Sequence, residues 1–172
     1  WRDARYGNFD IFMYDLGDDG IYGTGDDSGE IRISTNPKDQ FNPNVQGNKI
    51  VWMDYRNGDS SDIFMYDIGD DGIYGTGDDS GEIQITTSVQ REFRPDVYGN
   101  KIVWMEERQI VLDANIYLYD LGADGIYGTG DDSGEIQIAP NIASQSRPEI
   151  YENKIVWTSQ GDFSVIPKNR DL

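Results

Sequence analysis

Short apolar runs separated by polar, glycine-rich turns recur along the chain at intervals of 51 to 53 residues. Trp1, Trp52, Trp104 and Trp157 occupy the same position in successive intervals. Each full interval contains four segments with the character of β-strands, and no segment shows a helical period of useful length. Repeats of this length in an all-β sequence are typical of propeller blades. We therefore expect an all-β chain of about three four-stranded antiparallel blades and part of a fourth.

The four predicted strands differ in how their apolar residues are spaced. The first is a short proline-led segment, and a Gly-Asn or Glu-Asn turn joins it to the second. The second and third are apolar on consecutive residues, which predicts burial on both faces. The fourth alternates apolar and polar residues, as expected of a half-exposed outer strand. The first strands are predicted at residues 43–45, 95–97 and 148–150, and the second at 49–53, 101–105 and 154–158. The third are predicted at residues 10–15, 62–67 and 115–120, and the fourth at 30–34, 82–86 and 135–139.

Between the last two strands of each repeat lies an Asp- and Gly-rich loop. We call residues 15–31, 67–83 and 120–136 loops 1, 2 and 3. Twelve consecutive residues, starting at Gly20, Gly72 and Gly125, are identical in all three, whereas the segments between the loops differ. The carboxylates in each loop would repel one another unless a cation lay among them. The sequence therefore predicts three calcium sites.

The numbering of an EF-hand loop assigns the ligands. Counting from Asp15 places Asp at positions 1, 5 and 12 and Gly at position 6, while an apolar residue at position 7 would bind through its carbonyl. Position 3 is glycine, and water or the Asp at position 13 would fill the gap. Position 4 is not a ligand, and it is the acidic position that loop 3 lacks, at Ala123. The predicted ligands are Asp15, Asp19, Ile21, Asp26, Asp27, Asp67, Asp71, Ile73, Asp78, Asp79, Asp120, Asp124, Ile126, Asp131 and Asp132.

Two simpler interpretations apply to the loops. Asp-Gly and Gly-Asp-Asp can build turns without a metal, although turns do not need so many aspartates. The loop tyrosines Tyr22, Tyr74 and Tyr127 are expected to pack as plugs rather than to contact a ligand. The strand tryptophans Trp52, Trp104 and Trp157 are likewise expected in the core between blades, not in a carbohydrate site.

Composition excludes several classes of function. The net charge is −18, and 14 of the 32 acidic residues are the loop aspartates, so nucleic acid is a poor partner. The absence of Cys and His excludes disulfides, thiolate chemistry, zinc sites and histidine-dependent triads. No run is long enough to span a membrane. The chain opens at Trp1, which is expected of a mature form or an excerpt.

The stretch IVWMDYRNGDSSDIFMYDIG, residues 50–69, resembles the repeats of TolB-like β-propellers of bacterial and archaeal periplasmic and cell-surface proteins. The resemblance covers nearly the whole chain as one repeat domain, with repeats of approximately 1–51, 52–103 and 104–156 and a partial repeat of 157–172. It implies a propeller fold and leaves the function open. Because these repeats do not make a complete ring, the chain is either a segment of a longer propeller or pairs its ends with other copies.

Together these observations predict a non-enzymatic, extracellular calcium-binding module with about three Ca²⁺ ions per chain. Its role would be structural, adhesive or in assembly, with calcium fastening the outer hairpin of each blade. A propeller that binds a peptide or glycan on its axial face, lined by Arg5, Arg56 and Arg108, is the alternative. A glycosidase with two carboxylates is a weaker one, since the acids outside the loops show no repeated pairing.

Overall fold

The computed structural model describes residues 1–108, 113–139 and 144–160, and this part of the chain forms thirteen strands and no helix. The described residues thus contain no helix that could cross a membrane. All strand pairs are antiparallel, and the strands form four sheets. The all-β prediction is confirmed.

Two of the sheets are complete and have the same order. Each is a meander of four strands in which every strand pairs with the next along the chain. We call them sheets II and III. Sheet II comprises β4 (Gln40–Gln46), β5 (Lys49–Asp54), β6 (Asp62–Asp67) and β7 (Gly81–Gln84). Sheet III comprises β8 (Arg91–Tyr98), β9 (Lys101–Arg108), β10 (Asp113–Asp120) and β11 (Glu135–Gln137).

The other two sheets contain only part of this pattern. Sheet I has a short β1 (Arg2–Asp3) beside β2 (Asp10–Asp15) and β3 (Gly29–Arg32), which correspond to the third and fourth strands of a complete sheet. Sheet IV has β12 (Gln145–Tyr151) and β13 (Lys154–Ser159), which correspond to the first and second. Residues 161–172, which make up most of the predicted partial repeat of 157–172, lie outside the described residues.

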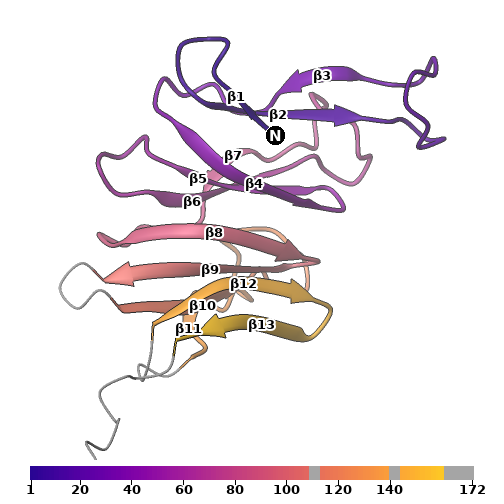
Figure 1. Ribbon diagram of the computed structural model, residues 1–172. Coiled ribbons are helices and arrows are strands. Elements are labelled where there is room, and N and C mark those ends of the chain that lie inside the picture. Colours follow the sequence, from indigo (N-terminus) through magenta and orange to yellow (C-terminus); the bar gives the residue numbers. More distant parts are fainter. Residues whose placement is uncertain (109–112, 140–143, 161–172) are drawn as a thin grey trace, which may run out of the picture.

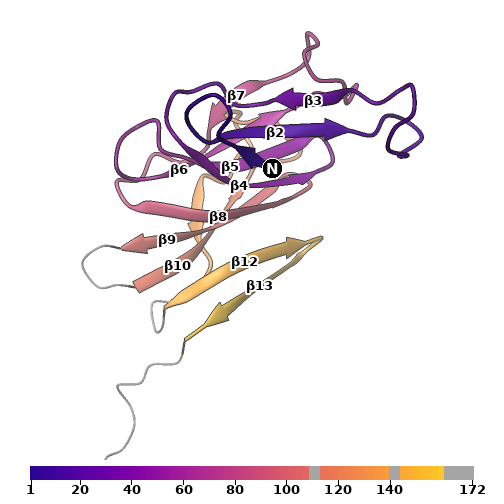
Figure 2. The same ribbon diagram turned by 45° about the horizontal axis from the view of Figure 1, so that its top comes forward.

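The four sheets follow one another in a row, with sheet I and sheet IV at opposite ends (Figures 1 and 2). The described residues do not close this row into a ring. Sheet II is covered on both faces, and its second strand shows why consecutive apolar residues are needed. Ile50 and Trp52 pack in the cluster shared with sheet I, while Val51 and Met53 pack in the cluster shared with sheet III. Trp52 and Trp104 are fully buried, as predicted, whereas Trp157, for which burial was also expected, is 39% exposed.

The prolines of the first strands lie within the strands and not at their start. The pairing of β4, β8 and β12 with the next strand shifts register beside the proline. Asn42, Arg94 and Arg147, which precede the three prolines, have φ of 51°, 52° and 56°. A bulge suits proline because proline has no N–H to donate to a ladder. The strands therefore begin three or four residues before the predicted positions.

Candidate metal-binding loops

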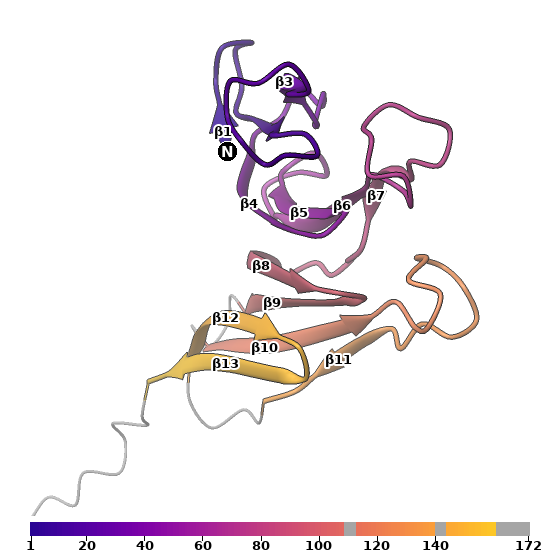
Figure 3. The same cartoon turned by 90° about the vertical axis from the view of Figure 1, so that its right-hand side faces the viewer.

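Each Asp-rich loop joins the third and fourth strands of its sheet, and loops 2 and 3 project from the same side of the row (Figure 3). A serine closes the base of every loop. In loop 1 the Ser28 hydroxyl accepts a hydrogen bond from the Asp15 amide at 3.0 Å, and the Ser28 amide donates to the Asp15 carbonyl at 3.1 Å. The same bonds recur at Ser80 and Ser133. The serine holds the first loop aspartate in place in all three copies.

The glycine at position 3 is explained by a close approach of the aspartate at position 12. Gly17 has φ +67°, and a Cβ on it would lie 2.4 Å from Oδ2 of Asp26. Gly69 beside Asp78 and Gly122 beside Asp131 show the same approach, at 2.4 and 2.3 Å. An EF-hand has a side-chain ligand at this position, whereas here the position-12 carboxylate occupies that space.

Three predicted ligand oxygens converge on a threonine at position 10 that the sequence analysis did not single out. The Thr24 hydroxyl lies 3.3 Å from Oδ1 of Asp19, 3.1 Å from the carbonyl oxygen of Ile21 and 2.6 Å from Oδ1 of Asp26. The corresponding distances around Thr129 are 3.3, 3.2 and 2.7 Å. A hydroxyl has one proton to donate, so most of these contacts bring lone pairs together without a hydrogen between them. Such a group of oxygens suits a hard cation.

Asp27, at position 13, supplies a further oxygen without a partner. Its Oδ2 accepts hydrogen bonds from the Tyr14 hydroxyl at 2.8 Å and the Gly23 amide at 2.6 Å. Its Oδ1 is buried and has no hydrogen-bond partner. A buried carboxylate oxygen left unpaired is costly. The oxygens at positions 5, 7 and 12 thus lie around one threonine hydroxyl, whereas among the described residues no three carboxylates of a loop each place an oxygen within 4.8 Å of the others.

The position-12 aspartates are also held in their charged form. The pKa values of Asp26, Asp78 and Asp131 lie below the usual range, first because the loop threonine hydroxyl donates to each, and then because backbone amides do. These carboxylates are accordingly ionised at neutral pH, which calcium binding requires.

Position 4 acts through its backbone, which explains why its side chain varies. The amides of Asp70 and Ala123 both donate to Oδ2 of the position-12 aspartate, at 2.8 and 2.6 Å. Replacing Asp by Ala at this position keeps the bond.

Position 1 differs between loops in its surroundings. Asp67 and Asp120 form ion pairs with lysines, Lys49 at 2.6 Å and Lys101 at 3.0 Å. No lysine or arginine of the described residues pairs with Asp15 in this way. In all three loops Oδ1 of this aspartate also accepts the amide at position 3. A cation at loops 2 and 3 would therefore share the position-1 carboxylate with a lysine.

The loop tyrosines connect neighbouring sheets. Tyr74, in loop 2, donates to the carbonyl of Arg32 in sheet I at 3.2 Å, and Tyr127, in loop 3, donates to the carbonyl of Ile85, just beyond β7 of sheet II, at 3.5 Å. Both rings pack on a tyrosine of their own sheet, with centroids 5.2 and 5.4 Å apart. Tyr22 has no preceding sheet beside it and is 77% exposed. The predicted plug is thus present in loops 2 and 3 and absent in loop 1.

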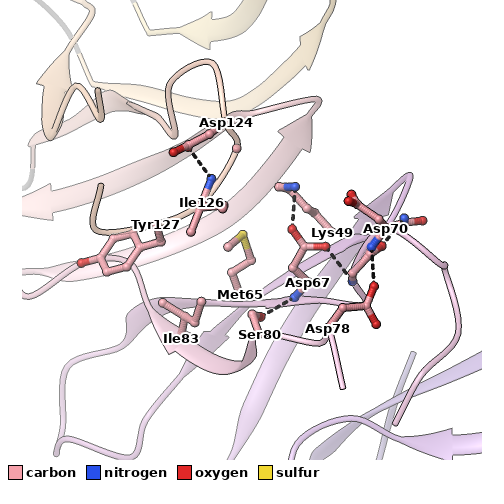
Figure 4. A pocket seen from close by; sticks show the side chains of 13 residues that line it. Lys49, Met65, Asp67, Asp70, Asp78, Ser80, Ile83, Asp124, Ile126 and Tyr127 are labelled. Carbon is pink, nitrogen blue, oxygen red and sulfur yellow. Dashed lines mark hydrogen bonds and ion pairs between the residues drawn. The ribbon is translucent and has the colours of Figure 1, made fainter. Parts of the chain in front are cut away.

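A cavity of about 340 Å³ lies between loop 2 and the start of loop 3 (Figure 4). Asp67 and Asp78 line it from loop 2, and Asp124, Ile126 and Tyr127 line it from loop 3. The Ile126 side chain is 60% exposed, and its counterparts in the other loops are equally exposed, so apolar side chains at position 7 do not enter the core.

Substituting position 3 tests the geometry of one loop. In Gly69→Ala, the new Cβ would clash with Asp78 and require a strained φ, so we expect calcium binding to fall by one site per chain. Gly77→Ala is the matched control, because a Cβ on Gly77 meets nothing within 4 Å and its φ is not positive. Isothermal titration of both variants gives the stoichiometry. Three intact sites in Gly69→Ala would show that Asp78 is not a ligand.

The arginines proposed to line a binding face are engaged within the chain. Arg5 contacts Asp3 and Glu30, and Arg56 contacts Asp54 and Glu82. Both guanidinium groups also lie over a phenylalanine ring, at 4.6 and 4.0 Å from its centroid. No observation on Arg108 bears on this alternative. The two described arginines link the second and fourth strands of their sheets rather than presenting a free charge.

A separate acidic cluster in sheet III was missed by the sequence analysis. Within the described residues, Glu92, Glu106 and Glu135 are the one group of three acidic side chains whose oxygens all lie within 4.8 Å of one another. Glu92 is fully buried, its Oε2 accepts from Thr86, and its Oε1 has no partner. Burial, with the nearby negative charges of Glu135, Asp62 and Glu106, raises the pKa of Glu92 to about 8. The only signal in the sequence is that Glu92 aligns with Gln40 and Gln145.

Comparison with known proteins adds no family to this description. A scan against protein-family models finds no matching model, and a search of curated proteins finds no match. The functional proposal therefore rests on the loops themselves.

Proposed function

We propose that the chain is a non-enzymatic, calcium-binding segment of a β-propeller, in which calcium ions occupy the three loops and those in loops 2 and 3 fasten sheets II and III to the sheet before. The four-stranded meanders stacked in a row support blades of a propeller. The observation that carries the proposal is the convergence of the oxygens at positions 5, 7 and 12 on the hydroxyls of Thr24 and Thr129, at distances between 2.6 and 3.3 Å. In each loop, Asp at positions 5, 12 and 13 and the carbonyl at position 7 would hold the ion, which would supply the missing positive charge.

The structural role follows from the tyrosine that comes directly after position 7. Tyr74 and Tyr127 reach the preceding sheet from the same turn that presents the Ile73 and Ile126 carbonyls. Fixing that turn fixes the tyrosine, so an ion in the loop would strengthen the contact between sheets. An extracellular location suits the proposal, because a loop of moderate affinity would be filled at the calcium concentrations found outside cells.

Calcium titration of chelator-treated protein tests the proposal. We expect about three ions per chain. Asp19→Asn, Asp71→Asn and Asp124→Asn should each remove about one, because the charge at position 5 is lost while its shape is kept. Asp59→Asn, outside the loops, is the matched control and should leave the stoichiometry unchanged. Absence of binding at millimolar calcium would refute the metal assignment and leave the loops as metal-free turns.

A further inference from the structure

Positions 5 and 6 of every loop form an Asp-Gly pair, and an aspartate followed by glycine can react with its own backbone. The amide nitrogen of the glycine attacks Cγ of the aspartate, water leaves, and a five-membered succinimide ring forms. Water then opens the ring at the backbone carbonyl and leaves an isoaspartate, in which the main chain runs through the former side chain. Glycine favours the first step because it has no Cβ to hinder the approach.

In loop 2, which belongs to a complete sheet, both reacting groups are accessible. Asp71 is exposed and Gly72 is partly exposed. The Ile73 amide donates to Oδ1 of Asp71 at 2.8 Å, which folds the aspartate side chain back along its own backbone. Within the described part of the chain the Gly72 amide donates no hydrogen bond. The attacking nitrogen is therefore free, and the carboxyl group is turned back toward it.

The same pair in loop 3 has less room. The Ile126 amide again donates to Oδ1 of Asp124, at 2.9 Å (Figure 4). Gly125, however, is buried, and a Cβ placed on it would lie 2.7 Å from Oδ1 of Asn100. The corresponding distance in loop 2, to Oδ1 of Asn48, is 3.6 Å. The succinimide ring must occupy space at this glycine, so Asn100 should hinder the reaction in loop 3 more than Asn48 does in loop 2.

The pair Asn57-Gly58, between β5 and β6, shows the opposite arrangement. Asparagine before glycine forms the same succinimide with loss of ammonia, so the sequence alone would select this pair as reactive. In the structure the Gly58 amide donates to the Tyr55 carbonyl at 3.2 Å, and the Asn57 side chain donates to Oδ2 of Asp62 at 2.7 Å. Both reacting groups are engaged in hydrogen bonds. The fold thus protects this pair and leaves the pair in loop 2 free to react.

We propose that Asp71 is a site of spontaneous isomerisation to isoaspartate in the folded chain, and that Asp124 reacts more slowly. The reaction requires no enzyme, cofactor or oxidant, because the water lost in the first step is regained in the second. It attaches the free carboxylate directly to Cα and lengthens the main chain of the loop by one methylene group. The inference does not depend on calcium binding, although the carboxylate that moves is the one at position 5.

The rates of reaction in the folded and the unfolded chain test the proposal. The protein is incubated at neutral pH with a chelator, once in buffer and once in concentrated urea, and circular dichroism confirms the β-sheet spectrum of the first sample. Samples taken at intervals are digested with trypsin, and electron-transfer fragmentation distinguishes isoaspartate from aspartate. The peptide Asn57–Arg91 contains Asn57, Asp59 and Asp71, so three sites are compared within one molecule. The rate in urea divided by the rate in buffer gives the protection of each site by the fold.

We expect almost no protection at Asp71 and about tenfold protection or more at Asn57, where the reacting groups are held apart. The protection of Asp124, measured on its own peptide, should fall between these two. Protection at Asp71 as large as that at Asn57 would overturn the proposal, because the loop would then hold the pair out of reach. It would also be overturned if isoaspartate in the folded chain were no more frequent at Asp71 than at Asp59, which is exposed and precedes serine.

Asn100→Ala tests the difference between loops 2 and 3. It removes the side chain that crowds the glycine of loop 3, so the protection at Asp124 should fall to that at Asp71. Asn48→Ala is the matched control: both asparagines donate to a loop carbonyl, but Asn48 leaves more room, so its loss should change the rate at Asp71 little. An unchanged rate at Asp124, or equal increases at the two sites, would show that crowding by Asn100 does not slow loop 3.

Discussion

Removal of calcium is expected to lower the melting temperature of this protein by on the order of 20 °C, the combined effect of three sites saturated to about a hundred times Kd. The loops hold a net excess of carboxylates, and Asp27 keeps a buried oxygen without a partner. Without a cation these groups repel one another and are incompletely paired, so the loop and the tyrosine contact beside it lose order. Differential scanning calorimetry with calcium and with a chelator measures the difference.

Magnesium provides a control for this first prediction. Magnesium demands a smaller, near-octahedral site and retains several of its waters, so at equal concentration it should recover only a small part of the lost stability. A melting temperature that does not change on chelation would contradict a structural role even if calcium bound. The ions would then lie in loops whose order does not matter to the packing of the sheets.

The stabilising effect of calcium on the contact between sheets can be separated from calcium binding itself. Tyr127→Phe removes the hydroxyl that donates to Ile85 but leaves every proposed ligand of loop 3 in place. Tyr22→Phe is the matched change in a tyrosine that is exposed. If calcium acts through the tyrosine, the first variant keeps three sites and loses part of the stabilisation, while the second loses none.

The sequence was sufficient for the strands because each strand has a local pattern. Residues 50–53 are apolar on consecutive positions, and the structure buries them between two sheets. The Asp-rich insertion was equally recognisable from its threefold recurrence. The fourth strands end two residues earlier than predicted, at Arg32, Gln84 and Gln137, because pairing stops before the chain passes to the next sheet.

What the sequence could not provide depends on contacts across the fold. Thr24 resembles an ordinary turn residue until the structure places three oxygens around it. Tyr74 and Tyr127 have the same sequence context as Tyr22, yet only they have a preceding sheet to contact. In the sequence the glycine at position 3 looks like a missing ligand, whereas in the structure Gly17 makes room for Asp26. The sequence pattern identifies the loop, whereas the contacts in the structure show which sheet the loop tyrosine reaches.

The second large effect, on the free energy of unfolding, is expected at Glu92, which is an acid where the repeat elsewhere has glutamine. Gln40 accepts from Ser34 and donates to backbone carbonyls, so both ends of its amide are used. Glu92 occupies the equivalent position on β8 and is fully buried, with Glu106 directly opposite on β9. Two acids facing each other across strands repel when ionised. The fold therefore favours the protonated form of Glu92, which explains the rise of its pKa to about 8.

The direction of the pH effect follows from that rise. The pKa of Glu92 is higher in the folded chain than the 4.5 of an unperturbed glutamate. Between these two values the folded state holds a proton that the unfolded state has released, so stability is greatest below 4.5 and falls as the pH rises through 8. Glutamine cannot ionise, so a chain with glutamine at this position does not lose stability in this way as the pH rises. We expect Glu92→Gln to raise the free energy of unfolding at pH 7 by about 1–3 kcal/mol.

Denaturant unfolding between pH 5 and 9, in saturating calcium, measures the effect. The gain from Glu92→Gln should be smallest at pH 5 and largest near pH 8. Glu149→Gln is the matched control, because it removes the same charge from an exposed position on β12 and corrects for the net charge of −18. Equal behaviour of the two variants would show that burial of Glu92 carries no penalty. A loss of stability in Glu92→Gln would instead show that the carboxylate is ionised in the folded chain, and that a positive charge within the cluster of Glu92, Glu106 and Glu135 balances it.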